Sequence, residues 1–433
     1  MEAQIGLPPG PRMTRAIQTA IWSRQAQWML TQSRRRFGPM FKLEIAYEGT
    51  WVVVADPDLV RQVFTGDPKV FHAGEGNDIL RPLLGENSVL VLDEAPHMSQ
   101  RKLLLPPFHG RRMAGYEATM REIAAREIES WPTGVPYQLR PRMQAMTLEI
   151  IIETVFGVHG GKQLDDLRKA LRAFLNMLTD PRFLVPMLTV GPDRIRGYPP
   201  FRRRVSQVAR LIVGEITERR AAADLEQRED ILSLLVAARH EDGSPMSDAE
   251  IHDELLTLLV AGHETTATAL SWAVERLIRH PEKLTRLRAE IEAGEDAYLT
   301  ATIQETLRLR PVLVGVLRRL TETVALGGYE LPAGVTVMPS IHLIHRDPTI
   351  YPEPERFRPE RFLETPPGTY TWIPFGGGVR RCLGAAFAQQ EMAIVLRELV
   401  ARRKLSPADP APERPFRRAI TETPRRNAEV VLA

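Results

Sequence analysis

The sequence predicts a mainly α-helical protein with small β-sheets. The middle of the chain, about residues 97–311, carries long stretches of helical pattern. The first part, about 8–95, contains short runs rich in β-branched and aromatic residues, and the last part, about 312–433, is dense in proline and glycine between short strand-like runs. We expect these three parts to form a single domain that covers residues 1–433.

One long helix stands out in the middle part. Ser247 and Glu250 have the spacing of a capping box, the run 255–261 is apolar, and Pro281 ends the pattern. About 33 residues at about 1.5 Å each would make a helix of about 50 Å. Because its centre is apolar on every side, we expect this helix to cross the core. A second helix is expected over about 297–310.

A β-hairpin is expected near the N-terminus. The runs 40–45 and 51–55 are rich in β-branched and aromatic residues, and 47–50 has the composition of a connection between two strands.

Composition excludes several classes of protein. The 57 basic and 54 acidic residues leave a net charge of +3, which is too small to indicate nucleic-acid binding. The single cysteine excludes an intrachain disulfide and a zinc site built from several cysteines. The N-terminus has no apolar signal region or spanning segment, so we expect a cytoplasmic protein without a membrane anchor.

Residues 262–266 interrupt the apolar centre of the long helix with glycine and polar side chains. Gly262 weakens a helix, Glu264 is costly to bury without a partner, and the Thr265 hydroxyl can compete for a backbone carbonyl. Two interpretations remain open from these residues alone. The helix either opens here toward a ligand, or it carries a packing notch with a satisfied polar cluster.

The segment 375–384 contains the only cysteine, Cys382, together with four glycines, and it leads directly into an apolar helix-like run, 385–396. A thiolate is favoured at such a helix N-terminus. The cysteine fits three roles: a small buried residue, a nucleophile with a distant histidine, or an iron ligand. In the third role, the glycines make room for a macrocycle and Arg380 faces a carboxylate of the cofactor.

Four motifs, in this order along the chain, resemble those of the cytochrome P450 family, and the similarity extends over about 8–432. They are the oxygen-activation motif at Ala261–Thr266, the E-x-x-R motif at Glu305–Arg308, the P-E-R-F motif at Pro359–Phe362 and the haem-binding signature at Phe375–Gly384.

This resemblance implies the cytochrome P450 fold, with a long central helix over haem b, and Cys382 as the axial ligand of the iron. It implies a monooxygenase that inserts one oxygen atom from O2 into a hydrophobic small molecule. Many bacterial members have histidine in place of Arg380, and arginine is a known alternative. The cofactor contacts implied are His97, Arg101, Ala261, Arg318, Phe375, Gly376, Arg380, Cys382 and Gly384.

The resemblance also implies two polar groups with different tasks. Glu264 and Thr265 would be catalytic, as the acid and alcohol that deliver protons during oxygen activation. Glu305, Arg308 and Arg361 would form a buried structural triad that holds the cysteine loop.

Substrate contacts implied by the family are Ala261, Leu313, Gly315 and Ile420, with further contacts from 71–91 and 174–188. The apolar lining favours a fatty acid, terpenoid, steroid or polyketide. We expect a monomer. The chain ends shortly after its last strand-like run, so we also expect no fused reductase domain and electrons from a separate ferredoxin or flavodoxin with its reductase. Residues that would dock this partner are Lys102, Arg111, Arg112 and Arg381.

Three other functions are compatible with this scaffold. A peroxygenase would use hydrogen peroxide directly, but Glu264 and Thr265 argue against it. A haem-binding sensor or carrier would have no use for a proton relay. A non-redox isomerase or dehydratase with a haem thiolate stays open from the sequence.

Overall fold

The computed structural model describes residues 4–157, 161–178, 195 and 197–433. The chain divides into two compact units. The first unit contains residues 1–72, 120–146 and 265–433, and the second contains 73–119 and 147–264. The units therefore interleave along the chain and do not follow the three parts expected from the sequence. Whether they act as one domain, as expected from the sequence, stays a prediction.

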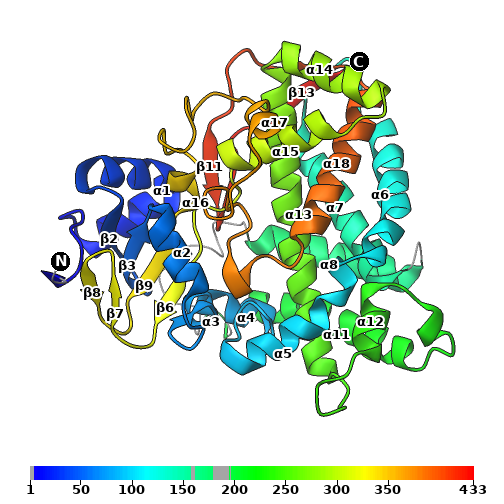
Figure 1. Ribbon diagram of the computed structural model, residues 1–433. Coiled ribbons are helices and arrows are strands. Elements are labelled where there is room, and N and C mark those ends of the chain that lie inside the picture. The colour runs from blue at the N-terminus through cyan, green and yellow to red at the C-terminus, as the bar shows by residue number, and fades with distance from the viewer. Residues whose placement is uncertain (1–3, 158–160, 179–194, 196) are drawn as a thin grey trace. The chain divides into compact units, whose positions relative to one another are not determined.

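All of the sheets in the described residues belong to the first unit. The largest has the strand order β2-β3-β9-β6-β4, so it joins N-terminal strands to strands from beyond residue 317 (Figure 1). β2 and β3 are the expected hairpin. The strands of this sheet are β2 (Met40–Ile45), β3 (Gly49–Val54), β4 (Phe71–His72), β6 (Arg318–Leu320) and β9 (Thr336–Pro339).

Three smaller sheets complete the β structure, with strand orders β1-β8-β7, β10-β13-β5 and β11-β12. Their strands are β1 (Gln4–Ile5), β5 (Tyr137–Gln138), β7 (Val324–Leu326), β8 (Tyr329–Leu331), β10 (Leu405–Pro407), β11 (Pro415–Arg418), β12 (Thr421–Pro424) and β13 (Glu429–Leu432).

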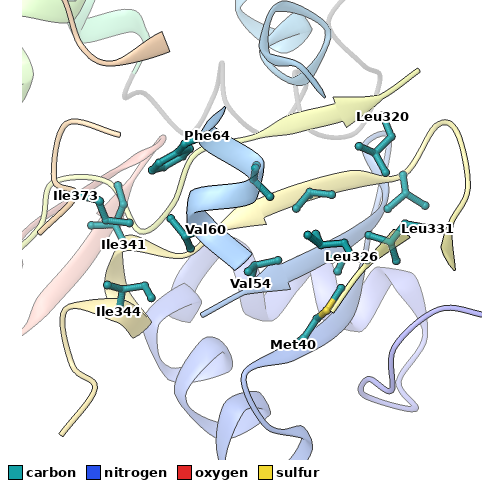
Figure 2. Close-up of a cluster of buried hydrophobic side chains, with 14 residues drawn as sticks. Met40, Val54, Val60, Phe64, Leu320, Leu326, Leu331, Ile341, Ile344 and Ile373 are labelled. Carbon is teal, nitrogen blue, oxygen red and sulfur yellow. The ribbon is translucent and has the colours of Figure 1, made fainter. Parts of the chain in front are cut away.

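Helix α2 covers one face of the five-stranded sheet. Its apolar side chains Val60 and Phe64 pack with Val54 of β3, Leu320 of β6 and Ile373, as Figure 2 shows. The helices of the first unit are α1 (Arg15–Phe37), α2 (Pro57–Thr65), α14 (Pro281–Glu292), α15 (Ala297–Leu309), α16 (Ile341–Ile344), α17 (Arg361–Glu364) and α18 (Ala385–Arg402), with a 3-10 turn, η4, at Gly378–Arg380.

The second unit is helical in its described residues. Helices α6 (Arg111–Glu129), α7 (Leu139–Phe156) and α13 (Asp248–Ile278) contribute residues to both units. Its own elements are α3 (Ala73–Gly76), α4 (Arg81–Leu84), α5 (Glu94–Leu104), α8 (Lys162–Leu178), α11 (Pro199–Arg220), α12 (Ile231–Ala237) and the 3-10 turns η1 (Asp78–Leu80), η2 (Pro106–Phe108) and η3 (Leu225–Gln227).

The long helix predicted from the sequence is α13, with 31 residues. Its capping box is confirmed: the Ser247 hydroxyl lies 3.2 Å from Glu250 N, and Glu250 Oε2 accepts a hydrogen bond from Ser247 N at 2.8 Å. The helix is buried along most of its length, which also confirms the apolar pattern. Among the described residues, no helix combines the length and apolarity needed to span a membrane.

A buried carboxyl group on α13 makes the stability of the protein depend on pH. Glu254 is fully buried, and this burial raises its pKa from 4.5 to about 9, helped by the nearby charges of Asp253 and Glu250 and opposed by the hydrogen bond from Val89 N. The unfolded chain loses this proton at a lower pH than the folded chain. Glu254 therefore makes the free energy of unfolding fall as the pH rises from about 4.5 to about 9.

Replacing Glu254 with glutamine is expected to remove this slope. The variant should be as stable as the parent protein at pH 4, and more stable at pH 8, by about 5 kcal/mol. Urea unfolding of both proteins at the two pH values measures the difference. Parallel stability profiles of the two proteins would contradict the burial argument.

Candidate active site around Cys382

The cysteine loop is a glycine turn that leads into α18. Gly376 and Gly378 have φ of 67° and 65°, in the region that favours glycine. Cys382 N donates a hydrogen bond to Phe375 O at 3.0 Å, which closes the loop, and the thiol of Cys382 is exposed. The loop therefore presents the sulfur atom three residues before the first residue of α18.

Two glycines of this loop make room for a phenylalanine of α2. A Cβ atom on Gly377 would lie 2.2 Å from the Phe64 ring, and a Cβ atom on Gly378 would lie 1.9 Å from Phe64 O. Phe64 itself belongs to the core that covers the five-stranded sheet. Gly377 and Gly378 are therefore required by protein packing, and whether the glycines also make room for a macrocycle stays a prediction.

Replacing Gly378 with alanine is expected to destabilise the protein by about 3 kcal/mol, because the variant combines a strained positive φ with a clash against backbone. Thermal unfolding and the haem content of the purified protein measure the effect. Gly115→Ala is the control: no atom lies closer than 3.9 Å to an added Cβ there, and alanine favours the helix. Equal stability of the Gly378 variant and the parent protein would contradict the packing seen at Phe64.

Aromatic side chains connect the cysteine loop to α15. The Trp372 ring contacts the Phe375 ring edge to face, with centroids 6.0 Å apart. Trp372 Nε1 donates to Gln304 O at 3.1 Å, and the ring also contacts Phe362 at 6.3 Å. The ring of Phe375, next to the start of the loop, is therefore positioned by Trp372, which the sequence patterns did not single out.

Glu305, Arg308 and Arg361 lie together in a buried network, as the resemblance implied. The Glu305 carboxylate accepts from Arg308 Nε at 2.6 Å and Nη2 at 2.9 Å, and it pairs with Arg361 Nε at 3.1 Å. The side chains of Glu305 and Arg308 are fully buried. Arg308 Nη1 also donates to His345 O at 2.7 Å. A glutamate and an arginine three residues apart on an exposed helix would form only a weak ion pair. Burial therefore distinguishes this network from an ordinary surface pair.

His345 connects this network to Ile373, two residues before the cysteine segment. Burial, with the charges of Arg308 and Arg346, holds the pKa of His345 well below its ordinary range, so the ring is neutral. Its Nε2 atom accepts a hydrogen bond from Ile373 N at 2.9 Å. His345 is another supporting residue that the sequence did not reveal, because no motif marks it.

Two of the predicted cofactor-binding arginines line the same small hollow on the first unit. Arg318 and Arg380 line it together with Phe64, Gly377 and Val379. Arg318 is buried and its guanidinium lies 5.7 Å from the centroid of the Phe64 ring. Guanidinium groups suit the carboxylates of a haem, and a thiolate is a known axial ligand of haem iron. The donors of this unit therefore fit the predicted cofactor.

Three other predicted cofactor contacts, His97, Arg101 and Ala261, lie in the second unit, whereas Phe375, Gly376, Cys382 and Gly384 belong to the first. His97 and Arg101 are one turn apart on α5, with His97 buried and Arg101 half-buried. Ala261 is exposed although most of its helix is buried, and Glu264 is half-buried. Thr265 follows Glu264 directly and begins the segment 265–433 of the first unit.

Helix α13 is continuous through residues 261–266, so the motif does not break the helix. Thr147 Oγ1 of α7 donates a hydrogen bond to His263 O at 2.9 Å. A Cβ atom on Gly262 would lie 3.4 Å from the Ile151 side chain, an ordinary contact. An opening of the helix toward a ligand, one of the two interpretations from the sequence, would therefore not involve an interruption of the helix.

The tentative substrate residues have different surroundings. Leu313 is half-buried, and Ile420 is exposed in the turn between β11 and β12. Gly315 has a packing reason of its own, because a Cβ atom there would lie 2.9 Å from Pro339 O. Residues 179–188 of the expected substrate region lie outside the described residues.

Part of the expected docking surface is already engaged in ion pairs. Lys102 pairs with Glu241 at 2.5 Å and Arg112 pairs with Glu229 at 2.5 Å. Arg381 is exposed, and the side chain of Arg111 lies outside the described residues. Two of the four cations are thus partly neutralised by neighbours within the second unit.

Comparison with known proteins identifies relatives along the whole chain. The family model for cytochrome P450 matches residues 6–428. A Mycobacterium tuberculosis protein described as cytochrome P450 135B1 is 43% identical over 99% of this chain and 92% of its own length. Another from the same species, cytochrome P450 135A1, is 37% identical over 99% of this chain and 95% of its own length.

Solved structures show the same fold. Retinoic acid-bound cyanobacterial CYP120A1 has a TM-score of 0.87 and 26% identity, covering 99% of this chain and 100% of that one. The haem domain of cytochrome P450DA has a TM-score of 0.82 and 23% identity, covering 100% of this chain and 98% of that one. The predicted mainly α fold with small sheets is confirmed.

Proposed function

This chain belongs to the cytochrome P450 family and is therefore a haem b-dependent monooxygenase; from that premise we propose how its own residues bind the cofactor and handle protons. Cys382 binds the iron through its thiolate. His97, Arg101, Arg318 and Arg380 bind the propionates. The observation that carries the proposal is the exposed Cys382 thiol on a loop fixed by Phe64. Further cofactor contacts are made by Ala261, Phe375, Gly376 and Gly384.

When bound, haem supplies the centre at which O2 is activated, and a thiolate ligand favours cleavage of the O–O bond. The Glu264 carboxyl takes protons from solvent and passes them to Thr265 Oγ1. The Thr265 hydroxyl then donates to the oxygen that is being reduced. These two groups are adjacent in α13, and both are only half-buried, which supports a path between solvent and the distal side.

The carbon monoxide complex of the reduced protein tests the ligand. With Cys382 as thiolate ligand, its Soret band should lie at about 450 nm. A band at about 420 nm from intact, folded protein would contradict thiolate ligation.

Replacing Thr265 with alanine is expected to uncouple the enzyme. Electrons and O2 would still be consumed, but hydrogen peroxide would be released in place of most of the oxygenated product, because the hydroxyl no longer delivers protons. The ratio of product to electron donor consumed measures the coupling, and we expect it to fall about tenfold. Thr265→Ser keeps the hydroxyl and should restore most of it. Unchanged coupling in the alanine variant would remove Thr265 from the relay.

For the substrate, we propose a hydrophobic molecule of terpenoid or long-chain type. Support comes from the CYP120A1 structure, which holds retinoic acid, an isoprenoid carboxylic acid. Ala261, Leu313, Gly315 and Ile420 would contact it. A spectral-shift titration with retinoic acid, palmitic acid and testosterone compares three of the possible classes. Electrons would come from a ferredoxin or flavodoxin with its reductase, and exposed Arg381 is a docking candidate.

A further inference from the structure

The segment 85–91, between α4 and α5, is held on α13 by three polar side chains. Asp253 Oδ2 accepts from Asn87 N and Asn87 Nδ2, both at 2.9 Å. Glu254 Oε1 accepts from Val89 N at 2.9 Å. The hydroxyls of Thr257 and Ser88 are hydrogen-bonded at 2.7 Å. We call Asp253, Glu254 and Thr257 the polar latch.

The segment also fits the polar latch sterically. Gly85 has a φ of 90°, and a Cβ atom there would lie 2.1 Å from Asp253 Oδ1. Only glycine therefore allows this close approach of the chain to the carboxylate. The side chains of Ser88, Val89 and Val91 are buried, so the segment is packed against the protein as well as hydrogen-bonded.

The polar latch fixes the segment 85–91 at a cost in the stability of the protein. Glu254 is fully buried, and its Oε2 atom has no hydrogen-bond partner among the described residues. Burying a carboxyl group with one unmatched oxygen costs stability, and an apolar side chain of similar size would avoid that cost. Because this arrangement is unfavourable for stability, it indicates that the position of the segment 85–91 is required for function.

The polar latch shares a helix face with the proposed distal residues. Asp253, Thr257, Ala261 and Glu264 follow one another at spacings of four, four and three residues, so they form one stripe along α13. Asp253 and Ala261 are about 12 Å apart along the helix axis. The latch thereby sets where the segment 85–91 lies along the stripe that carries Ala261 and Glu264, all within the second unit.

We propose that Asp253, Glu254 and Thr257 are positioning residues that determine which sizes of substrate the enzyme accepts, by fixing the segment 85–91 on the helix stripe that continues to Ala261. This inference rests on the proposed function, in which Ala261 contacts the substrate. Loosening the latch would let the segment move away from the stripe and admit bulkier molecules.

The test uses the haem-loaded enzyme with Asp253→Ala, and with Asn87→Ala, which removes a latch contact from the loop side and leaves the helix intact. Hydrogen–deuterium exchange of peptides that cover 85–91 reports whether the segment is held. Spectral dissociation constants of imidazole and of the bulky azole clotrimazole report the space on the distal side. Asp248→Asn is the matched control, because it removes an exposed pair with Arg220 from the same helix.

Both latch variants should exchange about tenfold faster over 85–91, since a hydrogen bond to a carboxylate is lost. The dissociation constant of clotrimazole should fall about tenfold relative to that of imidazole, while the control matches the parent enzyme. Unchanged exchange in both variants would overturn the proposal, and so would faster exchange with an unchanged ratio of the two constants. Failure of the proposed haem-thiolate function would appear in the parent enzyme instead, as a missing azole shift.

Discussion

Replacing Cys382 with serine is expected to abolish monooxygenase activity and to remove the carbon monoxide band at about 450 nm. A serine hydroxyl stays protonated and does not donate electron density to iron as a thiolate does. The loop itself should persist, because Cys382 N still donates to Phe375 O and the Gly378–Phe64 contact is untouched. The expected product is a folded protein whose haem, where bound, absorbs at about 420 nm with carbon monoxide.

Two measurements separate loss of the ligand from loss of the fold. Circular dichroism and the thermal midpoint of the Cys382→Ser variant should stay close to those of the parent protein, and turnover should fall by at least about a thousandfold. Retained turnover with the band at about 450 nm would show that another group binds the iron.

Replacing Glu305 with glutamine is expected to cost about 3–5 kcal/mol of stability, because it leaves Arg308 and Arg361 buried without their counter-charge. The effect should reach the haem site, since the same network holds His345, which accepts from Ile373 N two residues before the cysteine segment. We expect most of the purified variant to lack haem. Urea unfolding and the ratio of haem to protein measure the two consequences.

The chain offers a matched control for this variant. Glu353 and Arg356 have the same spacing of three residues and pair at 3.2 Å, but both side chains are about two-thirds exposed, at 64% and 65%. Glu353→Gln should change stability by less than about 1 kcal/mol and leave haem content unchanged. Similar losses for both variants would mean that burial does not determine the strength of the Glu305 network.

Local signals predicted the secondary structure well where they were strong. The hairpin strand 40–45 and the start of the helix at Ala297 coincide with the observed limits. The long helix has 31 residues against about 33 expected, because Pro281 begins the next helix and the residues before it form the connection. Proline favours the first turn of a helix, so it marks a start as well as an end.

Contacts between distant parts of the chain were beyond the local patterns. Four glycines near Cys382 predicted a close approach to the backbone, but nothing in that segment reveals that Phe64 is what approaches Gly377 and Gly378. The spacing of Glu305 and Arg308 is identical to that of many exposed pairs, and only the three-dimensional structure shows that both are buried. Motif order carried the assignment of the family, whereas the supporting roles of Trp372 and His345 needed the structure.

The interleaving of the two units has a consequence for biosynthesis. Strand β3 pairs with β9 in parallel, with Trp51 opposite Thr336, so the N-terminal hairpin waits for its partner while most of the chain is made. At about 5–20 residues per second, that wait lasts on the order of tens of seconds. During this time the unpaired edge of β3 and the apolar face of α2 are exposed on the nascent chain. Chaperone supply during translation should therefore affect the yield of folded protein.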